Sequence, residues 1–209
     1  MQRRTRFNVS KWILFAGAIC LVLSAIGNLF FYIPEVPAEV LLTTFIYKYI
    51  PSVLGNLLTV IGLAFVMTIN KSYLKAFIFS SITLTVSAIL MFPMLAPFLS
   101  ILVIGTINIV GTIVSFLTIL TYYFAFDGIS WYFDRLGDRT RSMLGQKLMW
   151  IFSIFIGCGC AVSWIPTFVS QIYESEAATR IIGIAENACF LAGYITYLIY
   201  LIRSLKNDF

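Results

Sequence analysis

The stretch WILFAGAICLVLSAIGNLFFY, residues 12–32, decides the fold that this sequence predicts. It contains no charged side chain, and its length matches the roughly 20 apolar residues that a helix needs to cross the hydrocarbon core of a bilayer. Further apolar stretches of comparable length follow at 50–69, 73–92, 98–124, 148–169 and 181–202. We therefore predict an all-α integral membrane protein, a single polytopic domain over 1–209 built as a bundle of six transmembrane helices.

The composition agrees with this fold class. Hydrophobic residues make up 60% of the chain and charged residues only 11%, whereas a soluble domain carries about 25% charged residues. The basic opening MQRRTRFNVSK has the character of a signal peptide. The apolar stretch behind it is longer than a signal core of roughly 7–15 residues and lacks a small-residue cleavage site. We expect residues 12–32 to be retained as the first membrane helix.

The positions of the cations predict the orientation, because lysine and arginine next to membrane helices stay on the cytoplasmic side. With both termini cytoplasmic, only Lys48 and Arg180 fall outside. The other cations fall inside: Arg3, Arg4, Arg6, Lys11, Lys71, Lys75, Arg135, Arg139, Arg141, Lys147, Arg203 and Lys206. Such a collar beside anionic lipid accounts for the net charge of +5 without nucleic-acid binding. We expect a multi-pass protein of the bacterial plasma membrane.

The cytoplasmic segment 127–147 carries an amphipathic pattern. Its apolar residues share one face of a helix: Ile129, Tyr132, Phe133 and Leu136. This spacing predicts a short interfacial helix that starts near Asp127, between the fourth and fifth spans. The helix either rests on the lipid headgroups or contacts a protein partner. The outer segment 33–49, which is semi-apolar and aromatic, either covers the bundle as a lid or rests on the lipid interface.

Familiar catalytic signatures are missing from the chain. It contains no histidine, which excludes His-based metal sites and His-activated nucleophiles. It also lacks a Walker loop and a dinucleotide-binding glycine motif. The cysteines of GCGC, residues 157–160, lie within a span, where a thiol ordinarily packs as a small hydrophobe. We expect that the protein is not an enzyme and that it has no catalytic site, no metal site and no cofactor.

Small and polar residues recur at helical spacing in five of the spans. These stripes either let membrane helices pack closely or line a polar interior. They comprise Gly17, Cys20, Ser24, Gly27 and Asn28; Ser52, Gly55, Asn56 and Thr59; Gly105, Asn108, Thr112 and Ser115; Ser153, Gly157, Cys160 and Trp164; and Gly183, Glu186, Asn187, Phe190, Tyr194 and Tyr197.

The carboxylate of Glu186 is the one acidic group inside a predicted span. A charge at mid-membrane costs about 2.5–3.5 kcal/mol on insertion scales, so such a residue is by default a candidate for function. At 1.5 Å per residue, Glu186 lies within roughly 10 Å of the outer boundary, together with Asn28, Asn56 and Asn187. The four residues can form one polar layer. A structural hydrogen bond from Glu186 to Asn28 or Asn56 is the alternative.

The predicted ligand-binding set adds aromatic walls to this layer. It comprises Glu186, Asn187, Asn28, Asn56, Trp164, Phe190 and Tyr194. In such a site Glu186 either attracts a cationic or hydrogen-bond-donating ligand or couples transport to a proton.

Two classes of function fit these residues. The first is a small-molecule binding or transport protein, acting as a homo-oligomer or as the substrate-binding member of a larger importer. The second is a non-catalytic subunit or assembly factor that meets its partner through residues 127–147. An internal duplication would favour transport, and Trp12 and Trp150 each stand eight residues before a cysteine, Cys20 and Cys158.

Overall fold

The computed structural model describes residues 3–30, 50–95, 104–168 and 175–205. Within these ranges the chain is all-helical and contains no strand. The helices are α1 (Arg3–Phe30), α3 (Ile50–Val66), α4 (Lys71–Leu95), α5 (Ile104–Arg135), α6 (Arg139–Phe168) and α7 (Glu176–Leu205). The segment 33–49, predicted as a lid or an interfacial loop, lies outside the described residues.

Four helical segments are long and apolar enough to cross a membrane: Thr5–Leu29, Gly111–Arg135, Arg139–Ile165 and Ala177–Leu205. Their outward faces carry large apolar side chains that are more than half exposed: Leu23, Phe116, Ile154 and Ile181. A soluble monomer rarely exposes apolar surface on this scale. The chain is therefore an integral membrane protein whose apolar helices contact the lipid bilayer.

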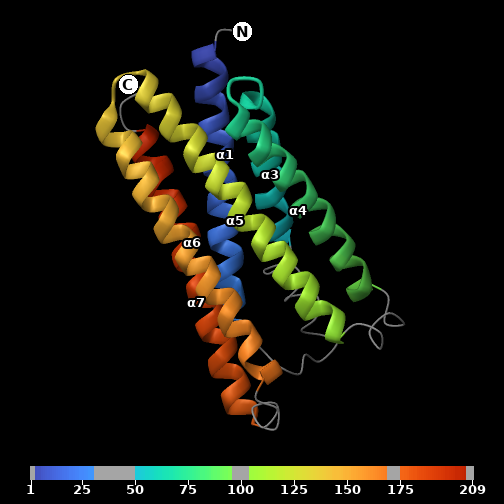
Figure 1. Cartoon of the computed structure of the whole chain (residues 1–209). Helices are drawn as coiled ribbons and strands as arrows, with labels where there is room; N and C mark the ends of the chain where they lie inside the picture. The colour runs from blue at the N-terminus through green and yellow to red at the C-terminus, as the bar shows by residue number, and fades with distance from the viewer. Residues whose placement is uncertain (1–2, 31–49, 96–103, 169–174, 206–209) are drawn as a thin grey trace.

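The helices form a closed ring, in which each helix packs against the next and α7 packs against α1 (Figure 1). The start of α1, the α3–α4 turn, the α5–α6 turn and the end of α7 lie at one end of the bundle, at the top of Figure 1. We call it the basic end, because exposed cations gather there: Arg6, Lys71, Lys75, Arg135, Arg139, Lys147 and Arg203.

The prediction of a separate interfacial helix that starts near Asp127 is wrong, because α5 continues without a break to Arg135. The apolar face that suggested it points into the bundle: Ile129 and Phe133 are 0% and 3% exposed. Burial against neighbouring helices therefore extends α5 where the pattern alone suggested a headgroup-bound segment. The chain turns at Gly137, whose φ of 79° is a left-handed conformation that favours glycine after a helix.

A close contact between α1 and α3 accounts for part of the small-residue stripes. A Cβ added to Gly55 would lie 2.7 Å from Leu21 Cγ, and one added to Gly17 would lie 3.1 Å from the Gly55 carbonyl oxygen. Ser10 Oγ also donates a 2.7 Å hydrogen bond to the Gly62 carbonyl oxygen across this interface. These positions are small because the two backbones approach closely, as glycines permit between membrane helices.

Lys11 joins the first helix to the last. Its side chain is 1% exposed, and its ammonium group donates a 3.1 Å hydrogen bond to the Ser204 carbonyl oxygen near the end of α7. The Lys11 Nζ atom also lies 5.0 Å from the centroid of the Phe7 ring. Carbonyl groups in the last turn of a helix have no partner within the helix and carry partial negative charge. Lys11 thus helps to close the ring at the basic end.

Replacing Lys11 by methionine keeps an unbranched chain but removes this charged donor. We expect the free energy of unfolding in detergent to fall by about 1–3 kcal/mol, the range for a hydrogen bond to a charged group. Thermal unfolding followed by circular dichroism measures the change. Lys147→Met is the control, because Lys147 is exposed. Equal stability of Lys11→Met and the wild type would contradict a closing function for Lys11.

Candidate functional site

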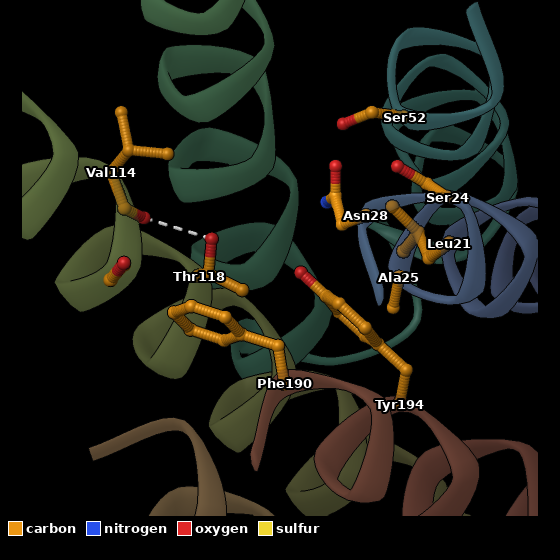
Figure 2. A pocket seen from close by; sticks show the side chains of 10 residues that line it. Leu21, Ser24, Ala25, Asn28, Ser52, Val114, Thr118, Phe190 and Tyr194 are labelled. Atoms are coloured by element: carbon orange, nitrogen blue, oxygen red, sulfur yellow. Dashed lines mark hydrogen bonds between the residues drawn. The ribbon is translucent and has the colours of Figure 1, made fainter. Parts of the chain in front are cut away.

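A cavity of about 140 Å³ lies between α1, α3, α5 and α7, in the half of the bundle away from the basic end (Figure 2). Among the described residues its walls contain hydroxyl, amide, aromatic and aliphatic groups and no charged side chain. The lining residues are Leu21, Ser24, Ala25 and Asn28 of α1, Ser52 of α3, Val114, Ser115 and Thr118 of α5, and Phe190 and Tyr194 of α7.

The polar groups of the cavity come from different helices. Figure 2 shows Ser24, Asn28 and Ser52 gathered on one side, with Thr118 and the α7 aromatic rings on the other. Thr118 Oγ1 donates a 2.8 Å hydrogen bond to the Val114 carbonyl oxygen, so its oxygen can still accept another. Each side of the cavity therefore combines hydrogen-bonding groups with apolar surface.

The side-chain oxygen of Asn28 is buried and has no hydrogen-bond partner among the described residues. Leaving a buried acceptor unsatisfied costs about 1–3 kcal/mol. A molecule in the cavity that donates an N–H or O–H to this oxygen would recover that cost. The Asn28 oxygen would therefore favour a ligand that donates a hydrogen bond.

The size of the cavity limits the ligand. A cavity of about 150 Å³ accommodates a molecule of the size of benzene. The volume of about 140 Å³ is therefore sufficient for a ring or a short chain with a few polar substituents. The rings of Phe190 and Tyr194 provide a surface on which a flat molecule can stack.

Three residues of the predicted ligand-binding set line this cavity: Asn28, Phe190 and Tyr194. Asn56 instead borders a second, deeper space between α3, α4 and α5. Thr118 lines both spaces, so they adjoin. Asn28 and Asn56 therefore line different spaces, and Asn56 lies nearer the basic end. The four residues of the predicted polar layer do not surround one cavity.

The remaining three predicted residues are not among those that line the cavity. The Asn187 amide nitrogen donates a 2.7 Å hydrogen bond to the Gly183 carbonyl oxygen of its own helix. The Trp164 indole nitrogen donates a 2.7 Å hydrogen bond to Thr112 Oγ1 and so ties α6 to α5. These two side chains have structural contacts that the sequence pattern did not indicate.

Glu186 lies on α7 one helical turn before Phe190 and two turns before Tyr194, on about the same face. It is half-buried, and its carboxylate is an electrostatic neighbour of Cys160 on α6 and Cys189 on α7. All four cysteines are free thiols. Within the described residues no group of three acidic, cysteine or histidine side chains could hold a metal ion.

The predicted ligand-binding set missed several residues that line the cavity. Ser24, Ser52 and Ser115 belong to the small-residue stripes but were left out of that set, while Thr118 was not assigned to a stripe. Thr118 follows Ser115 by three residues and so continues the stripe of α5 on the same face. Extending the stripe by one turn would have found it.

Comparison of the chain with protein-family models, curated proteins and solved structures found no match. The candidate site therefore rests on the geometry of the cavity between α1, α3, α5 and α7.

Proposed function

We propose that this protein binds a small uncharged molecule within the membrane and transports it across the bilayer. The observation that carries the proposal is a cavity of about 140 Å³ whose described lining residues carry no charge, and which is lined in part by Asn28, a residue with a buried and unsatisfied side-chain oxygen. Apolar walls with a few convergent polar groups are typical of small-molecule sites. A purely structural bundle has no reason to bury an unsatisfied acceptor beside a void of this size.

The proposed topology has six spans with both termini in the cytoplasm. It is supported by the common location of the start of α1, the end of α7, the α3–α4 turn and the α5–α6 turn at the basic end. Cytoplasmic connections carry the excess of lysine and arginine in membrane proteins. In this orientation the cavity belongs to the outer half of the membrane, so that a ligand would enter from outside.

A repeated hairpin is consistent with transport, because many transporters contain internal repeats. An interval of 138 residues relates α1 and α3 to α6 and α7. Trp12 and Trp150 are both more than half exposed, and Gly55 and Gly193 are both buried. Core positions also correspond at this interval: Leu14 with Phe152, Ala18 with Ile156, and Leu63 with Leu201.

The sequence-based assignment of Glu186 as the centre of the site is a separate part of the proposal. A carboxylate one turn from Phe190 would attract a cationic ligand, whereas the cavity walls themselves favour a neutral one. We infer that hydrogen bonds from the walls provide most of the selectivity and that Glu186 adds a secondary electrostatic preference.

Native mass spectrometry of the gently extracted protein tests the function, with benzamide, benzylammonium and benzoate as probes of equal size and different charge. We expect benzamide to bind and benzoate to be excluded. Glu186→Gln should leave the affinity for benzamide within about threefold of the wild-type value, because a neutral ligand has no net charge that Glu186 could attract. A tenfold loss of benzamide binding in Glu186→Gln would instead make Glu186 the centre of the site.

The alternative, a non-catalytic subunit of a larger complex, is favoured by the close α1–α3 packing that explains part of the stripes without a ligand. Such a subunit would meet its partner through residues 127–147, now the end of α5 and the start of α6. A stoichiometric protein partner in the same mass spectra, with no probe bound, would replace the transport proposal with this one.

A further inference from the structure

A cluster of hydroxyl groups continues the cavity toward the basic end. We call it the hydroxyl cluster; it lies between α3, α4 and α5, beside Asn56, and comprises Thr59, Ser80, Thr83, Thr118, Thr121 and Tyr122. The space among these residues is too narrow at every point to hold a water molecule. Thr118 is its boundary with the outer cavity.

Four of these hydroxyl groups have a partner within their own helix. The Oγ atoms donate hydrogen bonds of 2.8–3.0 Å to carbonyl oxygens one turn earlier: Thr59 to Gly55, Ser80 to Phe77, Thr83 to Phe79, and Thr118 to Val114. A hydroxyl that donates to a backbone carbonyl retains lone pairs that can accept. The cluster thus presents acceptors to any molecule that enters it.

The other two hydroxyl groups have no such partner. Thr121 is 3% exposed and Tyr122 is 2% exposed, and neither hydroxyl makes a hydrogen bond with any described residue. Thr59 lies near the Tyr122 hydroxyl, but no contact of that hydroxyl meets hydrogen-bond geometry. Two buried donors therefore border a polar space that water cannot fill, which is unfavourable unless something else occupies it.

We propose that the hydroxyl cluster is the inner half of the ligand site, closed in this conformation, and that it receives the polar end of the ligand. This inference rests on the proposed function. A ligand moving inward past Thr118 would accept a hydrogen bond from Tyr122 and from Thr121, while another of its groups donates to Asn28. The ligand class is then an uncharged molecule that has both donors and acceptors, such as a carboxamide or a short polyol.

The packing of the ring indicates where this space opens. Ser80 and Thr83 belong to α4, whereas Asn56 and Thr59 belong to α3. The contact between α3 and α4 is the least extensive of the contacts between neighbours in the ring. Separation of these two helices would widen the cluster with the smallest loss of packing. The structure, with its outer cavity and closed hydroxyl cluster, then corresponds to one conformation of a transport path. In this path the site opens first to the outer side of the membrane and then to the cytoplasmic side.

Tyr122→Phe tests the inference, because it removes only the hydroxyl. Without a probe, we expect an unfolding temperature equal to or above that of the wild type, since an unsatisfied buried hydroxyl is lost. With benzamide, we expect binding to weaken about tenfold or more, the loss that corresponds to one good hydrogen bond. Ligand-observed NMR on the detergent-solubilised protein measures the affinity, and Thr121→Val provides a second test if the first variant does not fold.

Tyr73→Phe is the matched control. The Tyr73 hydroxyl is also buried and without a partner among the described residues, but Tyr73 is outside the hydroxyl cluster. Its variant should bind benzamide like the wild type, and equal losses in the two tyrosine variants would overturn the inference. Normal binding in Tyr122→Phe with lost binding in Asn28→Leu would reject the inner site alone. Failure of the wild type to bind benzamide would reject both the inner site and the proposed function.

Discussion

Replacing Asn28 by leucine is expected to abolish the binding of benzamide while leaving the fold intact. Leucine has the same number and branching of side-chain heavy atoms as asparagine and is common in membrane helices, and the buried Asn28 oxygen makes no hydrogen bond that the variant would lose. The apolar replacement leaves the ligand amide without its acceptor, and a site that relies on hydrogen bonds rejects ligands that cannot pair. We expect the affinity to fall at least about 30-fold, measured by ligand-observed NMR.

Asn187→Leu is the matched control for this prediction, because it makes the same chemical change at another residue of the predicted set. The Asn187 amide is engaged with the Gly183 carbonyl oxygen of its own helix and does not line the cavity. Benzamide affinity should be preserved in this variant. If Asn187→Leu loses binding and Asn28→Leu retains it, the ligand site is not the cavity between α1, α3, α5 and α7.

Replacing Gly145 by valine is expected to cause the largest loss of stability. Gly145 of α6 is buried against the hydroxyl groups of Ser130 on α5 and Tyr200 on α7, which lie 3.2 Å apart in a hydrogen bond. An added Cβ would overlap both oxygen atoms, so the Ser130 and Tyr200 side chains would have to move and their hydrogen bond would break. Overpacking together with loss of a buried hydrogen bond predicts a fall of about 3–5 kcal/mol in the free energy of unfolding.

The same substitution at Gly157 tests whether position or chemistry causes the loss. Gly157 also lies within α6, but a Cβ added there would meet no atom within 4 Å. We expect Gly157→Val to unfold within about 1 kcal/mol of the wild type, the range of helix propensity alone. Comparable unfolding temperatures for the two variants, followed by circular dichroism in detergent, would show that the Ser130–Tyr200 contact does not hold the helices together.

The sequence alone was enough to bring predicted residues to one cavity where their position along a helix decides which way they face. Asn28, Phe190 and Tyr194 were chosen for their spacing, and they face one cavity because that spacing holds them on the inner faces of α1 and α7. Asn187 and Trp164 do not line this cavity, and their polar atoms are engaged with Gly183 and Thr112. Helical periodicity gives a direction, but it cannot tell which nearby group satisfies a polar atom.

The error at 127–147 has a related origin. An apolar stripe such as that of Ile129 and Phe133 is the same whether it faces lipid headgroups or another helix. Its burial depends on α1 and α7, which are far away in the sequence, as well as on α6, which folds back onto α5. Only the α5–α6 turn depends on a local feature of the sequence, because Gly137 permits the left-handed conformation that ends α5.

The sequence by itself determined the class of this protein, because long uncharged apolar stretches are stable only as helices in a bilayer, where each backbone group is satisfied within its own segment. The tertiary structure decided which helices adjoin and therefore where polar groups meet. The cavity and the hydroxyl cluster each combine residues from at least three helices. Such sites follow from the closing of α7 onto α1 and the order of helices around the ring, which no single segment encodes.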